Sequence, residues 1–451
     1  MKRWLLFVPL IVYLILPTRN FYWDGVAFAI NIEKHLPAAD LIHPNHLVYA
    51  LCGEWLYRAL ESAGVHVRAL FLLQAVNAIL AGLAVILFAT CLQQKALALV
   101  LAFSATWWKF ATDADAYIPS IFFLICCYVL LERSKHSVVA GLAHAAAMLF
   151  HQLAILFFPV AWWRYRKQPR NLAVFTISAL IPTTVCYLAA YGNTQHHQGF
   201  LQWLTAHSPD SHFSFNPIRD AALTIRGTFR LILGGKLSEF PHDAVSILAL
   251  VSLAIALIVF IRSKPRLPLI QLGAQWLIWT AAFVLFLFFW MPQNTFYRLF
   301  YLPPLIALFR IPKHATVLTF IPVLTLWNFT FEIYPQSRPQ ANASLNFALA
   351  HRSDWQAGTP VVYHTFHPDL WTISYFDSQA AWVGIDDANP NRLEQLLQYA
   401  RRERTELWFE ATAYDLLMAN AQARAWLASN GPVHLLEYKD EKHDFRFYHL
   451  R

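Results

Sequence analysis

The stretch that decides the fold is residues 67–92, VRALFLLQAVNAILAGLAVILFATCL, in which Arg68 is the single charged side chain. An apolar run of about 20 residues is long enough to cross the hydrocarbon core of a bilayer as a helix. The whole chain has this character, because 57% of its 451 residues are hydrophobic and 14% are charged. Soluble domains carry about 25% charged residues. We therefore predict a polytopic α-helical membrane protein and exclude disordered, coiled-coil and disulfide-rich secreted classes.

Similar apolar runs recur along the chain and predict about eleven spans. They are residues 4–16, 67–92, 95–111, 116–132, 137–150, 152–164, 171–191, 244–262, 268–291, 297–310 and 314–331. A semi-apolar stretch at 47–60 carries Glu54 and Arg58. It predicts a helix that lies in the membrane interface rather than a span.

The charges of the connecting turns predict the orientation of these spans. Lysine and arginine collect in cytoplasmic turns of membrane proteins. Every second turn of this chain is basic: Lys95 and residues 132–135, 164–170, 262–266 and 310–313. The net charge of +8 is explained by these turns before any nucleic-acid partner is considered. We expect the N-terminus inside and the C-terminal segment outside.

Two larger segments are expected outside the spans. Residues 192–243 form an outer loop with amphipathic character at 217–233. Residues 336–451 regain charge, with strand-like runs at 361–363 and 407–409 and helix-like runs at 390–404 and 413–428. We predict two domains, a membrane domain over 1–335 and a soluble extracytoplasmic α/β domain over 336–451. No G-x-x-x-x-G-K-[ST] loop occurs, which argues against an ATP-driven pump.

Candidate functional side chains gather at the predicted outer face. Ionisable groups at membrane depth are costly, and they are usually paired or functional. The candidates come from outer turns far apart in sequence: Asp24; His43 and His46; Asp113, Asp115 and Tyr117; His151 and Gln152; Tyr297 and Arg298.

Each candidate also has a purely structural interpretation. Asp24 could cap a helix that begins at Gly25. Asp113 and Asp115 could be solvated turn residues or helix caps, and His151 with Gln152 could be a satisfied core pair. The spacing of His43 and His46 permits a metal, although Pro44 lies between them. Arg298 could be an anchor that extends its charge to the interface.

Together these motifs resemble the GT-C superfamily of integral-membrane glycosyltransferases. The features are an early acidic residue, His-Pro-x-x-x-x-Tyr at 43–49, the Asp-Ala-Tyr turn at 115–117, a broken helix with His151-Gln152, and Phe-Tyr-Arg-Leu at 296–299. Bacterial members related to the protein mannosyltransferase and aminoarabinose transferase groups are the most similar. The resemblance covers residues 1–310, by layout more than by identity.

The resemblance implies a polyprenyl-phosphate-linked sugar donor and an active site at the outer interface. Asp24 matches the acidic residue that serves as catalytic base or positions the acceptor. Asp113 and Asp115 match an acidic turn that lines the cavity and in some members contributes to a metal site. Arg298 matches a basic residue that meets the lipid phosphate, and the remaining candidates would contact substrate.

One departure from the family pattern keeps other functions open. Asp24 stands alone, since the next acidic residues, Glu33 and Asp40, are nine or more positions away. The sequence predicts a glycosyltransferase acting on a glycan, lipid or protein acceptor, with no cofactor except a divalent cation left undecided. The alternatives are a flippase or transporter of a lipid-linked saccharide and a non-catalytic envelope scaffold.

Overall fold

The computed structural model describes residues 3–133, 136–193, 199–205, 213, 215–266, 268–270, 273–311, 314–377, 379–439 and 444–450. The described residues omit parts of three predicted turns and loops, namely the basic turns 132–135 and 310–313 and the outer loop 192–243. The chain forms two compact units. Unit 1 comprises Met1–Thr18 and Asn31–Ser337, and unit 2 comprises Arg19–Ile30 and Arg338–Arg451.

Unit 1 is built almost entirely from helices. Its longer helices are α1 (Val8–Ile15), α4 (Tyr49–Ser62), α5 (Ala69–Cys91), α8 (Tyr117–Glu132), α9 (Ser137–Phe150), α10 (Phe158–Tyr165), α11 (Pro169–Asn193), α13 (Pro217–Ile232), α14 (Ala244–Arg262), α15 (Ala274–Phe289) and α17 (His314–Asn328). Shorter elements are η1 (Arg3–Leu6), α3 (Ala38–Leu41), η2 (Pro44–His46), α6 (Leu97–Phe103), α7 (Ala105–Ala111), η3 (Gln152–Phe157), α12 (Phe200–Leu204), η4 (Leu237–Glu239), β1 (Leu269–Ile270), η5 (Phe296–Tyr301), α16 (Leu302–Ala307), β2 (Phe309–Arg310), η6 (Phe329–Ile333) and α18 (Tyr334–Gln336).

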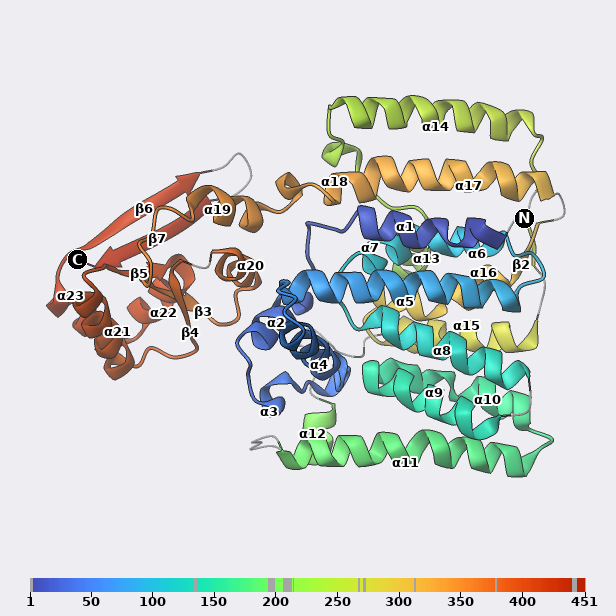
Figure 1. Cartoon of the computed structure of the whole chain (residues 1–451), viewed down its shortest axis with the longest axis horizontal. Coiled ribbons are helices and arrows are strands. Elements are labelled where there is room, and N and C mark those ends of the chain that lie inside the picture. The colour runs from blue at the N-terminus through green and yellow to red at the C-terminus, as the bar shows by residue number, and fades with distance from the viewer. Residues whose placement is uncertain are drawn as a thin grey trace. The chain divides into compact units, whose positions relative to one another are not determined.

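The long helices of unit 1 lie side by side (Figure 1). Helix α1 packs on α5, α5 on α8, α8 on α9 and α9 on α11, while α14 packs on α17. Large side chains such as Trp107, Trp108 and Trp279 are fully buried between them. A buried tyrosine ties two of the elements together, because the Tyr13 hydroxyl donates a 2.6 Å hydrogen bond to the Ala102 carbonyl.

Several of the apolar runs form helices that suit a multi-pass membrane protein. Four helical segments are long and apolar enough to cross a membrane, namely Ala69–Cys91, Pro169–Asn193, Ala244–Arg262 and Ala315–Gln336. Shorter apolar helices cover Trp4–Ile15, Tyr117–Glu132, Ser137–Phe150 and Ala274–Phe289. The predicted interfacial stretch at 47–60 is helix α4. The total number of spans and their orientation remain predictions.

The expected spans at 95–111 and 297–310 are broken in the structure. The run at 95–111 forms α6 and α7, because Ser104 between them has an extended backbone. The run at 297–310 forms η5, α16 and β2. Two prolines, Pro303 and Pro304, stand in the first turn of α16, where they lack the N–H needed to continue the preceding turn. Side-chain polarity alone does not reveal such breaks in apolar runs.

Unit 2 contains a five-stranded mixed sheet in the order β4-β3-β5-β7-β6. Its strands are β3 (Pro360–His364), β4 (Ala381–Ile385), β5 (Leu407–Glu410), β6 (Val433–Lys439) and β7 (Asp444–Leu450). Strand β3 pairs in parallel with β4 and β5, and β7 pairs antiparallel with β5 and β6. The helices are η7 (Pro339–Ala341), α19 (Ala343–His351), α20 (Pro368–Phe376), α21 (Pro390–Glu403), α22 (Ala411–Ala419) and α23 (Ala421–Asn430).

The strand-like and helix-like runs of the C-terminal segment correspond to these elements, with one difference. The run at 413–428 predicted one helix, and the structure has α22 and α23. Asn420 separates them because its side-chain oxygen accepts hydrogen bonds from the backbone N–H groups of Gln422 and Ala423, at 2.9 and 3.1 Å. This is the bonding of an N-cap, so the side chain favours a new helix start at this point.

Helix α2 (Trp23–Glu33) begins in unit 2 and ends in unit 1. Its first residues pack within unit 2, where the Phe21 ring stacks on Phe376 at 5.4 Å and the Trp23 ring lies 6.5 Å from Trp371. The Asn342 side chain donates a 3.1 Å hydrogen bond to the Arg19 carbonyl. The first outer segment therefore contributes part of its length to the unit that contains the C-terminal sheet.

Candidate functional site

The turn that carries Asp113 and Asp115 is buried in unit 1. Both side chains are 0% exposed, so the interpretation as solvated turn residues is wrong. One carboxylate oxygen of Asp115 accepts a 3.3 Å hydrogen bond from the backbone N–H of Tyr117, the first residue of α8. A carboxylate at this position is stabilised by the helix dipole. Asp115 therefore supports the start of α8 from an interior position.

Two amide side chains on α5 hold this turn in place. Asn77 donates hydrogen bonds to the carbonyls of Asp113 and Asp115, at 2.8 and 2.7 Å. Gln74, one turn earlier, donates to the carbonyls of Thr18 and Thr112, each at 3.0 Å. Sequence reasoning missed both amides. Their spacing of three residues inside a long apolar run was the available signal, since polar side chains in spans are usually functional or paired.

Tyr49 of α4 lies within the electrostatic reach of both carboxylates. Burial raises the pKa of the Tyr49 hydroxyl well above its usual value, and the charges of Asp115 and Asp113 raise this pKa further. The hydroxyl therefore stays protonated throughout the physiological pH range. Tyr49 supplies a neutral phenol beside two buried carboxylates, and sequence reasoning did not select it beyond its place in the His-Pro motif.

Four predicted residues come together in an imidazole and aromatic cluster. The His151 ring lies 4.8 Å from His46, 5.0 Å from Tyr117 and 5.6 Å from Tyr297, measured between ring centroids. Burial, together with the smaller effect of the charge of His43, lowers the pKa of His46 to about 3. His46 is therefore neutral at physiological pH. Tyr117 links the cluster to the acidic turn, because its N–H reaches Asp115 and its ring contacts His151.

A cavity of about 380 Å³ opens beside this cluster. His151, Gln152 and Tyr297 line it together with the apolar side chains of Leu153, Ile155, Leu156, Phe213, Phe286 and Trp290 and with Asn45 and Thr205. The described residues that line it do not include Asp113, Asp115 or Arg298. An apolar, aromatic wall with a few polar groups at one side is typical of pockets that bind small molecules.

Gln152 and His43 have structural bonds of their own. The Gln152 side chain donates a 3.0 Å hydrogen bond to the Leu204 carbonyl, and this bond ties η3 to α12. His43 caps η2, since its Nδ1 accepts a 3.2 Å hydrogen bond from the Asn45 N–H. Among the described residues, no three or more His, Cys, Asp or Glu side chains are grouped so that they could hold a metal ion.

Arg298 is fully buried, with 0% of its surface exposed. Its guanidinium donates to the Pro292 carbonyl at 2.6 Å, the Tyr301 hydroxyl at 3.0 Å and the Thr224 hydroxyl at 3.5 Å. Gly227 of α13 provides the space for it, because a Cβ there would lie 2.4 Å from Nε. This placement does not fit an anchor that extends to solvent. No carboxylate among the described residues forms an ion pair with Arg298.

Helix α13, which carries Gly227, also carries a buried carboxylate that sequence reasoning missed. Asp220 lies one turn before Thr224 on α13 and is 0% exposed. One of its oxygens accepts a 2.7 Å hydrogen bond from the Asn216 N–H, at the start of the helix. Asp220, Thr224 and Gly227 share one face of α13 at a helical spacing, which is the polar side of the amphipathic pattern at 217–233.

Asp24 belongs to unit 2, whereas Asp113, Asp115, His151 and Arg298 belong to unit 1. Helix α2 begins at Trp23, so Asp24 lies in its first turn and does not cap a helix that begins at Gly25. A carboxylate in the first turn is favoured by the helix dipole. A cavity shared by Asp24 and the acidic turn remains a prediction from the sequence.

No family model and no curated protein matches the chain. Two solved structures of ArnT from Cupriavidus metallidurans are similar to it. The one bound to undecaprenyl phosphate is 12% identical, with 98% of this chain and 96% of that chain covered and a TM-score of 0.46. The apo structure is 11% identical, with 96% and 93% covered and a TM-score of 0.45. Identities and scores at this level assign no residue role.

Proposed function

We propose that this chain is an integral-membrane glycosyltransferase. It would move a sugar from a polyprenyl-phosphate-linked donor to an envelope acceptor at the outer face of the bacterial inner membrane, with residues 336–451 on that side. The GT-C resemblance of residues 1–310 supports the class. The observation in the structure that carries the proposal is the buried Asp113–Asp115 turn, joined through Tyr117 to a cavity lined by His151 and Tyr297.

The proposed reaction is a direct displacement at the anomeric carbon. The acceptor hydroxyl oxygen forms a bond to this carbon while the bond from the carbon to the phosphate oxygen breaks. The lipid phosphate leaves with the electron pair, and the hydroxyl proton passes to a carboxylate acting as general base. Asp24 takes this role by the resemblance. A single displacement inverts the configuration of the sugar.

Unit 1 offers groups for the rest of this reaction. The cavity is large enough for a sugar ring. Tyr297 and Trp290 line it with their rings stacked on each other at 5.1 Å, and this aromatic pair offers flat apolar surface to the sugar. His151 adds a polar group at the cavity wall. Arg298 follows Tyr297 and carries a planar fork of donors that matches a phosphate. A bound phosphate would take the place of the Pro292 carbonyl as its partner.

A transfer assay tests this proposal. Purified full-length protein in proteoliposomes receives polyprenyl-phosphate sugars that differ only in a radiolabelled sugar, together with an envelope extract as acceptor. We expect free polyprenyl phosphate and labelled acceptor to form in equal amounts. Movement of the intact labelled lipid across the bilayer, without release of polyprenyl phosphate, would identify a flippase instead. Neither transfer nor movement with any donor would favour the scaffold.

A further inference from the structure

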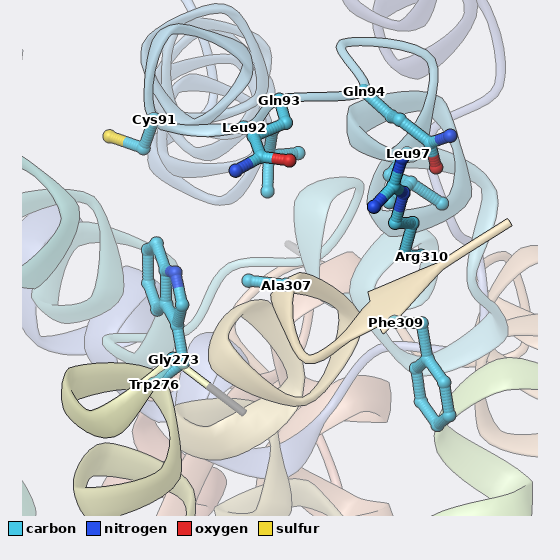
Figure 2. Close-up of a pocket in the computed structure, with 10 residues that line it drawn as sticks. All are labelled: Cys91, Leu92, Gln93, Gln94, Leu97, Gly273, Trp276, Ala307, Phe309 and Arg310. Carbon is cyan, nitrogen blue, oxygen red and sulfur yellow. The ribbon is translucent and has the colours of Figure 1, made fainter. Parts of the chain in front are cut away.

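A second cavity of unit 1 lies away from the proposed transfer site. It measures about 230 Å³ and forms where α5 ends, α15 begins and α16 ends. Its lining residues are Cys91, Leu92, Gln93, Gln94, Leu97, Gly273, Trp276, Ala307, Phe309 and Arg310. Figure 2 shows Arg310 extending from β2 and Trp276 from α15 on different sides of the cavity, with residues 91–94 across from both.

The two cavities lie toward opposite ends of α15. Trp276 is in the first turn of this helix, whereas Phe286 of the aromatic cavity is in its last turn. Ten residues of α-helix correspond to about 15 Å. The second cavity is also bordered by the basic turns at Lys95 and Arg310, which the charge pattern places on the cytoplasmic side. It is therefore separate from the site assigned to the transfer reaction.

The backbone that carries Arg310 is fixed from two sides. Strand β2 pairs with β1, with Arg310 opposite Leu269. On the other side the Gln94 amide donates to the Ile311 carbonyl at 2.7 Å, and its oxygen accepts from the Ile311 N–H at 3.0 Å. The side chain itself forms no hydrogen bond or ion pair with the residues that the structure describes. A strand bonded on both sides thus presents to the cavity a guanidinium that has no partner among the described residues.

The remaining walls are apolar or neutral. Trp276 stacks on Tyr128 at a centroid distance of 3.9 Å, which holds its ring in place. Leu92, Ala307 and Phe309 extend the apolar surface, and Gln93 adds an amide. No carboxylate is among the described lining residues, so nothing in the lining repels an anion. A guanidinium binds phosphate through two parallel hydrogen bonds, which an ammonium does not reproduce.

We propose that this cavity binds a phosphate ester, with Arg310 and Gln93 at the phosphate and Trp276 against the apolar part of the ligand. Two sources share this chemistry, an anionic lipid headgroup and a soluble phosphate ester. The lipid is favoured because the cavity lies where apolar helices end. Tryptophan and basic residues also gather at this level of membrane proteins, and they attract anionic lipids there.

Cys91 is one of the lining residues and provides a readout at the edge of the cavity. Purified full-length protein in neutral detergent is alkylated with a maleimide, and the rate at each cysteine is followed by peptide mass spectrometry. The probes are phosphatidylglycerol, phosphatidylcholine and glycerol 3-phosphate. At a concentration ten times the dissociation constant, a ligand should slow Cys91 about tenfold. We expect this with phosphatidylglycerol and not with phosphatidylcholine, while the exposed Cys52 reacts at an unchanged rate.

Two variants make the test specific. Arg310→Gln should abolish the protection of Cys91, and Arg266→Gln should retain it, because Arg266 is exposed near the same end of the unit without lining the cavity. Phosphatidylglycerol retained in native mass spectra gives a second readout for the same variants. Protection by glycerol 3-phosphate would support binding of a phosphate ester and would identify a soluble ester, rather than a lipid, as its source. Equal protection and retention in Arg310→Gln and wild type, or none with any probe, would overturn the proposal.

Discussion

The side-chain nitrogen of Asn77 lies 2.7 Å from the carbonyl oxygen of Asp115. The same amide donates a second hydrogen bond, of 2.8 Å, to the carbonyl of Asp113. One residue of α5 therefore holds the backbone on both sides of Ala114, and the two buried carboxylates keep a fixed spacing. The acidic turn is positioned by an amide from another helix in addition to the hydrogen bonds of its own side chains.

Replacing Asn77 by leucine should destabilise unit 1. The variant removes the hydrogen bonds that Asn77 donates to two buried carbonyls, and the loss of a buried hydrogen-bond partner costs about 1–3 kcal/mol. We expect a lower thermal unfolding midpoint in detergent. Thr90→Val on the same helix is the control, because among the described residues its exposed hydroxyl bonds only to the Leu87 carbonyl and to Cys91. A midpoint for Asn77→Leu equal to that of Thr90→Val would show that the turn holds without Asn77.

Asp115→Asn should distinguish the effect of the carboxylate's charge from the effect of its hydrogen bond at the start of α8. Asparagine keeps an oxygen that can accept from the Tyr117 N–H, so the start of α8 should persist. The negative charge beside Tyr49 is lost. If this carboxylate serves the reaction, transfer should fall by about 100-fold or more, at an unfolding midpoint close to that of the wild type. Unchanged transfer would limit Asp115 to its role at the helix start.

Arg298→Lys should weaken use of the lipid donor. Lysine lacks the planar fork, and each charge-assisted hydrogen bond contributes about 1.5–3 kcal/mol, or about 10- to 150-fold. The measurement is kcat/KM for the polyprenyl-phosphate donor at equal expression. Activity within about twofold of the wild type would contradict a phosphate role, because that change is far below the loss of one such bond.

Gly227→Ala tests whether Arg298 needs the space beside Gly227, and it changes no charge. The new Cβ would lie 2.4 Å from Nε, so the guanidinium or α13 must move. We expect both donor use and the unfolding midpoint to fall. Gly192→Ala is the matched control, since nothing lies within 4 Å of a Cβ there. Equal behaviour of the two variants would mean that the packing of Gly227 against Arg298 has no consequence.

The buried His46 predicts a loss of stability in acid. Burial lowers its folded pKa to about 3 from an ordinary value of 6.5. The unfolded chain therefore binds the proton more readily, and stability falls as the pH drops from 6.5 toward 3. His46→Gln should show a smaller drop in unfolding midpoint between about pH 7.5 and about pH 5. His66→Gln, at an exposed position, should retain the wild-type drop.

Sequence patterns predicted the parts of this fold that depend on local character. The apolar run at 67–92 is α5, the semi-apolar run at 47–60 is α4, and the charged C-terminal segment contains strands at 361–363 and 407–409. The break at His151-Gln152 was predicted from its polar side chains, and α9 does end at Phe150, whereas the breaks within 95–111 and 297–310 were not predicted. At Ser104 the break follows from backbone conformation, and the residues of α6 before it are uniformly apolar.

The candidate site was predicted in part for a related reason. His46, Tyr117, His151 and Tyr297 were selected from separate turns, and the structure brings their rings together. Contacts such as Asn77 to Asp115 join residues 38 positions apart, and no local pattern specifies which partner a buried amide will find. No sequence pattern singled out Thr224 and Gly227. Both contact Arg298 in the fold, and this contact identifies them as part of its surroundings.

The most direct test of the central claim compares Asp24→Asn with Asp40→Asn in the proteoliposome transfer assay. Asp40 is the matched control because it is an exposed carboxylate in the same outer segment. If Asp24 is the general base of a glycosyl transfer, its asparagine variant should lose about 100- to 10,000-fold in turnover, with normal membrane insertion, while Asp40→Asn keeps wild-type turnover. Release of polyprenyl phosphate at the wild-type rate by Asp24→Asn would contradict the account.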